Sequence, residues 1–195
     1  MKLSHAFEVP ASPAATLRLL LGAERVVECM PGAQLLETVD ERTWKAKMTV
    51  KLGPVAMDFA NDVHLVEVDE AGGRVRMEAS GRETHGKGGA RADITCVLTD
   101  SGAGTRVEMA TDLRFSGQAA QLGRPSVVQD VSSRLVERFA DCLGAQLSGD
   151  SGEAKAARER TEKPLRPFSL FVAVLVEALR RALRRGGHQA RGRST

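Results

Sequence analysis

The side chains that most often carry out chemistry are few in this sequence, and their spacing does not suit catalysis. His5, His64, His85 and His188 show neither the spacing of metal ligands nor a neighbouring pattern of carboxylates. No pair of carboxylates falls on an apolar face, so general acid–base catalysis has no support in the sequence. We therefore predict a protein that is not an enzyme and that holds no metal ion and no covalently attached cofactor.

The cysteines give no sign of a reactive or cross-linked site. The chain has three of them, Cys29, Cys96 and Cys142, and none belongs to a C-x-x-C pair. This number and spacing indicate no disulfide framework and favour a reducing compartment. Cys96 lies in a segment of alternating polarity, where we expect it to be a small buried hydrophobic residue.

A long stretch of the chain alternates polar and apolar residues, which predicts β-strands. The alternating segments are residues 2–9, 33–40, 44–52, 55–68, 75–81, 92–98 and 107–115. Short turns separate most consecutive segments, as in an antiparallel meander. Val66 and Val68 break the alternation of their segment, which predicts a β-bulge near them.

Helical periodicity flanks these segments. Ser12 and Pro13 suit the start of a short helix, and residues 23–30 fit a second one. After Gly117, apolar residues recur every three or four positions up to Leu147, which predicts a long amphipathic helix. Such a helix must bury its apolar face, so we predict an α+β fold in which a curved antiparallel sheet grips the long C-terminal helix.

Large apolar side chains on the inward face of this sheet form the candidate ligand site. They are Trp44, Met48, Met57, Phe59, Met77, Met109, Leu113 and Phe115 in the strands, with Phe139 in the long helix. Methionine adapts to a soft apolar guest, while Ala46, Ala79, Gly81 and Ala92 leave space between the larger side chains. Taken by themselves, these residues favour an ordinary filled core over a cavity.

Charge and composition change near residue 148. Residues 1–147 carry 17 basic and 20 acidic side chains, whereas residues 148–195 carry 11 basic and 5 acidic ones. Residues 148–166 fit a flexible linker, residues 167–186 a basic amphipathic helix, and residues 187–195 a disordered basic end. The uncharged run of this tail would span about 15 Å as a helix, half of the ~30 Å that a hydrocarbon core requires.

The tail helix is predicted to lie on a membrane surface. Its apolar stripe consists of Phe168, Phe171, Val172, Leu175, Leu179 and Leu183, and its arginines are Arg180, Arg181, Arg184 and Arg185. Such a stripe enters the headgroup boundary while the arginines meet anionic lipid. Docking on the domain or on a partner protein is the alternative. No aromatic residues are interleaved with the basic ones, so no nucleic-acid partner is expected.

Four stretches of residues 1–147 together resemble the family of the carbon monoxide dehydrogenase G subunit. They are residues 29–33 (CMPGA), 51–54 (KLGP), 86–90 (GKGGA) and the segment from Asp112 through Gly123 to Ser132. This family lies in the helix-grip superfamily of START and polyketide-cyclase-like domains. The resemblance implies a helix-grip fold with an internal hydrophobic cavity, and it does not extend to residues 148–195.

The resemblance also implies a function. It suggests a non-enzymatic carrier that binds a respiratory quinone, menaquinone-like, or another isoprenoid lipid. It implies association with the cytoplasmic membrane surface and with a molybdenum hydroxylase of the carbon monoxide dehydrogenase type, so we expect a cytoplasmic protein bound peripherally to the inner face of the membrane. Two alternatives stay open: a membrane anchor or maturation factor that carries no ligand, and a cyclase-like enzyme acting in the pocket.

Overall fold

The computed structural model describes residues 1–52, 55–86, 88–122 and 124–149 of the 195-residue chain. The predicted linker beyond Gly149, the tail helix at residues 167–186 and the basic end at residues 187–195 lie outside the described residues.

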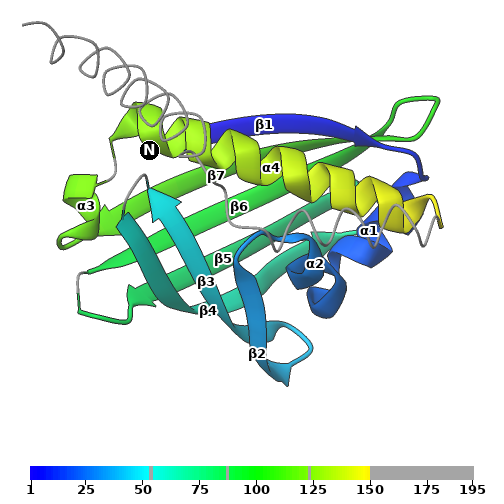
Figure 1. Ribbon diagram of the computed structural model, residues 1–195. Coiled ribbons are helices and arrows are strands. Elements are labelled where there is room, and N and C mark those ends of the chain that lie inside the picture. The colour runs from blue at the N-terminus through cyan, green and yellow to red at the C-terminus, as the bar shows by residue number, and fades with distance from the viewer. Residues whose placement is uncertain (53–54, 87, 123, 150–195) are drawn as a thin grey trace, which may run out of the picture. The chain divides into compact units, whose positions relative to one another are not determined.

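Seven antiparallel strands form one sheet in the order β1-β7-β6-β5-β4-β3-β2 (Figure 1). The strands are β1 (Lys2–Val9), β2 (Ala33–Asp40), β3 (Thr43–Leu52), β4 (Val55–Asp69), β5 (Arg74–Glu83), β6 (Gly89–Asp100) and β7 (Thr105–Ser116). Strands β2 to β7 each pair with the next in sequence, as expected of a meander, and β1 pairs with β7 to form the opposite edge.

Three β-bulges bend the sheet. One lies between Leu65 and Glu67 in β4 and confirms the break in alternation seen in the sequence. Two others lie in β2, beside Leu36 and Val39. The residues left unpaired at these bulges, Leu36, Val39 and Val66, are the exposed large hydrophobic residues of the described part of the chain.

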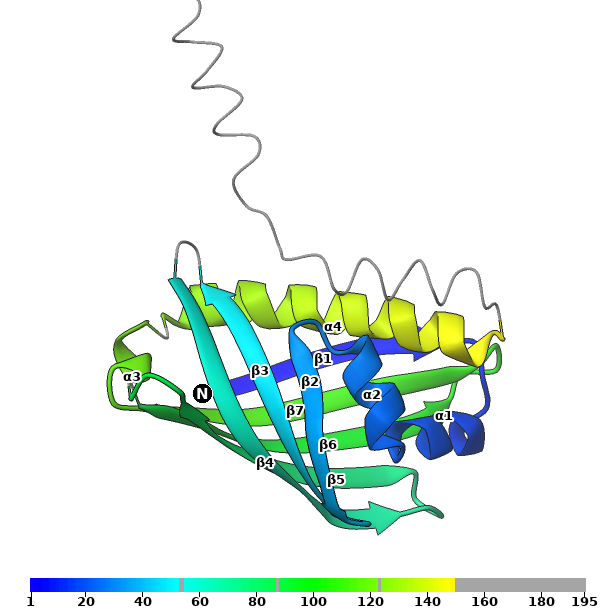
Figure 2. The ribbon, with the colours of Figure 1, turned by 60° about the horizontal axis from the view of Figure 1, so that its bottom comes forward.

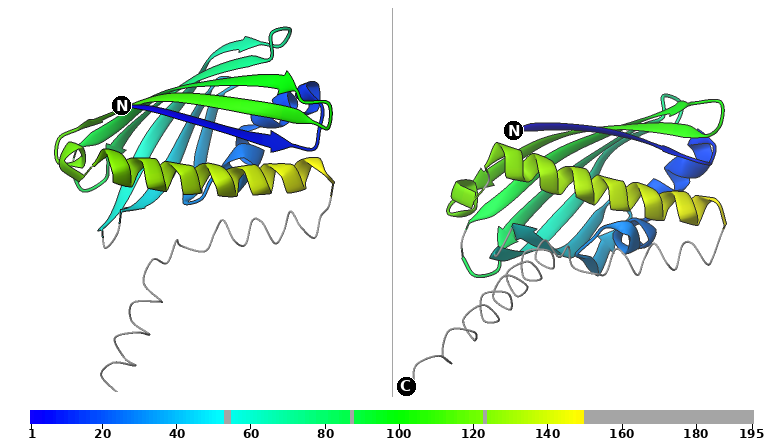
Figure 3. Two further views of the ribbon diagram at one scale, coloured as in Figure 1. Left: turned by 90° about the horizontal axis from the view of Figure 1, so that it is seen from above. Right: turned by 45° about the horizontal axis from the view of Figure 1, so that its top comes forward.

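Four helices accompany the sheet in the described residues: α1 (Pro13–Leu20), α2 (Ala23–Cys29), α3 (Ala119–Leu122) and α4 (Pro125–Leu147). The long helix α4 lies lengthwise over the concave face of the sheet, while α1 and α2 stand at the end where α4 terminates (Figures 2 and 3). This arrangement confirms the predicted α+β architecture, a curved antiparallel sheet that grips a C-terminal helix.

Two fully buried threonines fix α1 to the sheet. The Thr105 hydroxyl of β7 donates to the Ala11 carbonyl at 2.6 Å, and the Thr16 hydroxyl of α1 lies 3.4 Å from the Thr105 hydroxyl and 3.1 Å from the Ser12 carbonyl. Ser12 also caps the helix, because its Oγ accepts a hydrogen bond from the Ala15 amide at 3.4 Å. These bonds satisfy the polar groups that packing of α1 removes from water.

The C-terminal half of α4 packs tightly against β1, α1 and α2. Phe139 and Leu143 are buried in this cluster with Val9 and Leu19. Phe139 meets Phe7 edge to face, with 6.1 Å between ring centroids, a favourable arrangement for two aromatic rings. This end of the domain therefore has a filled core.

A disulfide joins Cys29, the last residue of α2, to Cys142 in α4. Both residues are fully buried, and the Gln146 Nε2 donates toward the Cys29 sulfur at 3.1 Å. The prediction that the chain contains no disulfide is therefore wrong, and the argument for a reducing compartment that rested on it falls. The spacing of these cysteines in the sequence does not indicate the pairing, because only the docking of α2 on α4 brings the two residues together. Cys96 is a buried free cysteine, as predicted.

Candidate functional site

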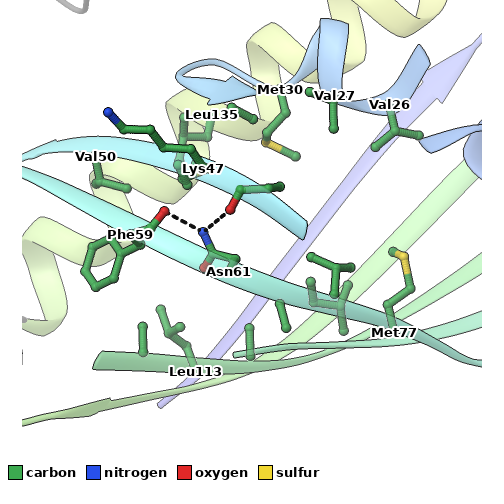
Figure 4. Close-up of a pocket in the computed structure, with 18 of the residues that line it drawn as sticks. Val26, Val27, Met30, Lys47, Val50, Phe59, Asn61, Met77, Leu113 and Leu135 are labelled. Atoms are coloured by element: carbon green, nitrogen blue, oxygen red, sulfur yellow. Dashed lines mark hydrogen bonds between the residues drawn. The ribbon is translucent and has the colours of Figure 1, made fainter. Parts of the chain in front are cut away.

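A cavity of about 410 Å³ lies between the concave face of the sheet and the helices. This volume falls within the range of roughly 300–1,000 Å³ that is usual for pockets holding a drug-sized molecule. Its walls come from strands β2 to β7, from α1 and α2, and from the N-terminal half of α4 (Figure 4).

Small residues in the middle of the sheet create this space. Register places Ala46, Asn61, Gly81 and Ala90 side by side across four strands. The next row across the sheet contains Val63, Ala79, Ala92 and Leu113. Because alanine and glycine project little or nothing from a pleated sheet, the floor lies low beneath the helices, and close packing is not reached there.

Seven of the nine predicted ligand-site residues line the cavity. They are Trp44, Met48, Met57, Phe59, Met77, Leu113 and Phe115. Met109 and Phe139 do not: Met109 packs against the core beneath α1, and Phe139 belongs to the filled cluster around Phe7. Binding of a ligand by the seven remains a prediction.

The helices contribute lining residues that were absent from the predicted site. Val26 and Val27 of α2 and the following Met30 face the cavity, as do Val131 and Leu135 of α4. The spacing of residues 128, 131 and 135 marks one face of a helix, so this signal was present in the sequence. Which part of that face meets an empty space and which part meets the core depends on the docking of α4.

Polar side chains at the cavity are few. Ser132 in α4 donates to the Gln129 carbonyl at 2.9 Å, and its Oγ lies 3.2 Å from the His5 Nε2. Lys47 at the rim pairs with Asp58, 3.2 Å away. The hydroxyl of Thr49 and the ammonium of Lys47 hold the pKa of the Asp58 carboxyl below its usual range, so this carboxylate stays ionised at neutral pH.

Asn61 is the polar side chain on the floor of the cavity. Its Nδ2 donates to the Phe59 carbonyl at 3.0 Å and to the Ala46 carbonyl at 3.3 Å (Figure 4). A Cβ atom built on Gly81 would lie 2.2 Å from the Asn61 Oδ1. Gly81 therefore gives room to the amide, and no other residue type fits there without moving Asn61.

This arrangement suits shelter of an apolar molecule. In the described residues, no group of three His, Cys, Asp or Glu side chains is placed to hold a metal ion. The lining is instead almost entirely aliphatic, aromatic or thioether. Transfer of an apolar surface from water to such walls contributes about 25 cal/mol per Å².

Comparison with known families gives one match. The family model described as the G subunit of carbon monoxide dehydrogenase (CoxG) matches residues 6–148. No curated protein sequence matches the chain.

Solved structures share the fold at low sequence identity. A conserved protein of Geobacillus kaustophilus superposes with a TM-score of 0.68 at 15% identity, over 76% of this chain and 96% of that one. A protein of Thermus thermophilus gives 0.55 at 15% identity, over 78% and 100%. The protein Ara h 8.0201 gives 0.51 at 13% identity, over 77% and 99%. These similarities establish the helix-grip fold of residues 1–149.

Proposed function

Because the chain belongs to the family of the carbon monoxide dehydrogenase G subunit, we propose that it is an accessory protein that carries a hydrophobic ligand and catalyses no reaction itself. The proposed ligand is a respiratory quinone of the menaquinone type or a related isoprenoid lipid. The proposed route runs between the cytoplasmic membrane and a molybdenum hydroxylase of the carbon monoxide dehydrogenase type. The observation that carries this proposal is the apolar cavity of about 410 Å³.

The energetics of such a cavity suit reversible carriage. A fused ring system buries about 250 Å², the area of a large aromatic side chain, which contributes about 6 kcal/mol. Loss of translational and rotational freedom on binding offsets much of this gain. Because the proposal includes no ionic or metal contact to the ligand, burial of apolar surface alone holds the ligand in the cavity. The ligand can therefore still be released to a second apolar site.

The proposed membrane contact rests on the C-terminal segment. No helix among the described residues is long and apolar enough to cross a membrane. In the proposal, the basic helix at residues 167–186 holds the protein at the inner face of the membrane, and each arginine adds about 1 kcal/mol of attraction to anionic lipid. A flexible linker at residues 148–166 would give the domain a mean reach of roughly 20–25 Å.

A disulfide is uncommon in the cytosol, where thiol reductants keep cysteines reduced. Exchange requires a thiolate to reach one of the two sulfur atoms. Cys29 and Cys142 are both 0% exposed, so a reductant reaches the bond only when α2 and α4 separate. The proposed location therefore remains compatible with a lasting disulfide.

The test uses the full chain purified from a host that contains quinones, washed free of membrane and extracted with organic solvent for mass spectrometry. We expect close to one quinone per chain. Ala92→Leu, which places a larger side chain on the cavity floor, should abolish retention. Ala60→Leu makes the same change at an exposed position of β4 and should retain the ligand.

Added quinone gives a second measurement. The chain has one tryptophan and no tyrosine, and Trp44 lines the cavity, so intrinsic fluorescence reports on this site alone. Quinone from loaded vesicles should quench Trp44 in the wild type and in Ala60→Leu, and much less in Ala92→Leu. An empty extract together with unquenched Trp44 would reject the carrier and leave the anchor or maturation factor. A chemically altered product in the extract would instead favour a cyclase-like enzyme.

A further inference from the structure

The amide of Asn61 has only one orientation compatible with its neighbours. Its nitrogen lies 3.0 Å from the Phe59 carbonyl oxygen and 3.3 Å from the Ala46 carbonyl oxygen. Rotation of the amide by half a turn would place Oδ1 against these two acceptors, and both hydrogen bonds would be lost. An asparagine amide has two N–H donors, and both are used here by the backbone.

The Asn61 Oδ1 is the part of this side chain that is still free to form a hydrogen bond, and it is an acceptor. Oδ1 lies over the Cα of Gly81, which pairs with Asn61 across β4 and β5. Among the described residues, no backbone or side-chain group donates a hydrogen bond to this oxygen, and Asn61 lines the cavity. A carbonyl oxygen at the floor of an apolar cavity gains a hydrogen bond when a guest brings a donor, and it repels a guest that brings another acceptor.

The second polar side chain of the cavity does not reverse this preference. The Ser132 hydroxyl already has two protein partners, because it donates to the Gln129 carbonyl at 2.9 Å and its Oγ lies 3.2 Å from the His5 Nε2, so it supplies no free donor to the cavity. The Lys47 ammonium, which has three N–H donors, is 42% exposed, pairs with the Asp58 carboxylate and points away from Asn61 (Figure 4), so it does not place a donor on the cavity floor. The cavity is thus apolar, with the Asn61 Oδ1 as the acceptor on its floor.

We infer that the cavity selects an apolar ring compound that carries a hydroxyl group, and that the Asn61 Oδ1 accepts a hydrogen bond from this hydroxyl. For a quinone-type ligand, the reduced hydroquinone has two O–H donors, whereas the oxidised quinone has two carbonyl acceptors. The protein therefore binds the hydroquinone more tightly than the quinone. This inference rests on the proposed function, because it assigns the polarity of the same cavity.

Two pairs of probes test the inference. Menadiol and menadione differ in redox state, while naphthol and methylnaphthalene have similar shape and differ in the O–H group alone. Menadiol is prepared beforehand and added anaerobically without excess reductant, so that the Cys29–Cys142 disulfide stays intact. Dissociation constants are measured by titration calorimetry on the full chain. One hydrogen bond corresponds to about a 3- to 10-fold preference, and we expect menadiol to bind more tightly than menadione by this factor.

Three variants locate the preference. In Asn61→Leu, the affinity ratio of naphthol to methylnaphthalene should fall by the same factor of about 3 to 10. Gly81→Ala keeps the asparagine but displaces its oxygen, since the new Cβ would lie 2.2 Å from Oδ1, and it should lower the ratio as well. Ser132→Ala is the control and should leave the ratio unchanged.

The outcomes are distinct. Equal or tighter binding of menadione to the wild type overturns the inference and leaves a ligand-binding cavity in place. A ratio that survives in Asn61→Leu, or that collapses in Ser132→Ala, also overturns it. If none of the four probes binds the wild type, the proposed carrier function fails, and the inference fails with it. The comparison of probes on the wild type stands even if a variant does not fold.

Discussion

Removal of the Cys29–Cys142 disulfide should destabilise the domain by several kcal/mol. The bond joins residues 113 positions apart, so it closes a loop that includes most of the sheet. In the chain-entropy treatment, a cross-link over a loop of this length lowers the entropy of the unfolded chain enough to stabilise the fold by about 4.8 kcal/mol at 25 °C. Losses measured for native disulfides commonly run from about 2 to 5 kcal/mol.

These free energies translate into a shift of the unfolding temperature. A domain of about 150 residues unfolds with an entropy of about 0.3 kcal/mol per kelvin. The expected decrease in Tm is therefore about 15 °C for the full chain-entropy effect, and about 6 °C for the low end of the measured range.

The assay compares the double variant Cys29→Ala/Cys142→Ala with the wild type by calorimetry, without reductant. Cys96→Ala is the control, because it removes one buried thiol and no cross-link. Thiol titration in denaturant provides an independent count: the structure predicts one reactive thiol per chain before reduction and three after it. Three thiols before reduction, or a double variant no less stable than the control, would refute the reasoning.

Three further predictions concern single features of the chain. Thr105→Val keeps the side-chain volume but leaves the Ala11 carbonyl without its donor, so the free energy of unfolding should decrease by about 1–3 kcal/mol in urea titration, and no decrease would contradict the role of this bond. Burial raises the pKa of the Cys96 thiol to about 11, above its unfolded value near 9, so stability should be fully present below pH 9 and decrease as pH rises toward 11. This loss should reach about 2–3 kcal/mol relative to Cys96→Ala, and parallel pH profiles of the two proteins would contradict it. Replacement of the four tail arginines at residues 180, 181, 184 and 185 by Gln should weaken binding to anionic vesicles by roughly 100- to 1,000-fold and leave the weak binding to neutral vesicles unchanged, whereas equal binding by both proteins would exclude the electrostatic contact.

The sheet was predictable because each strand has one face toward water and one toward the interior. Polar and apolar residues therefore alternate along each strand in the sequence. Even the bulge in β4 is visible in the sequence, as a break in this alternation at Val66. The α4 helix was predictable for the corresponding reason, since its apolar stripe recurs every three or four residues. Local periodicity thus determines the elements and the face that each one buries.

The errors concern what the buried face meets. Met109 projects from the same face as Leu113 in β7, yet it packs in the core beneath α1 while Leu113 lines the cavity. Phe139 follows the same helical stripe as Leu135, but one turn further along it meets Phe7 instead of the cavity. Position along an element decides between core and cavity, and this depends on where α1 and α2 dock. The Cys29–Cys142 pair escaped prediction for the same reason.

The location of the disulfide makes physical sense for a domain that is hollow at its centre. Enclosed cavities in protein cores cost up to about 24 cal/mol per Å³, so 410 Å³ would cost about 10 kcal/mol if it were fully enclosed and dry, and the opening at the rim lowers this upper value. A domain of this size has a total stability of only about 5–15 kcal/mol. The cross-link lies in the filled end, between two helices that both line the cavity, and its contribution of about 4.8 kcal/mol offsets part of that cost. A bound ligand restores lost contacts in the same cavity, so it should raise the Tm of the Cys29→Ala/Cys142→Ala variant as well as that of the wild type, by an amount that grows with ligand concentration.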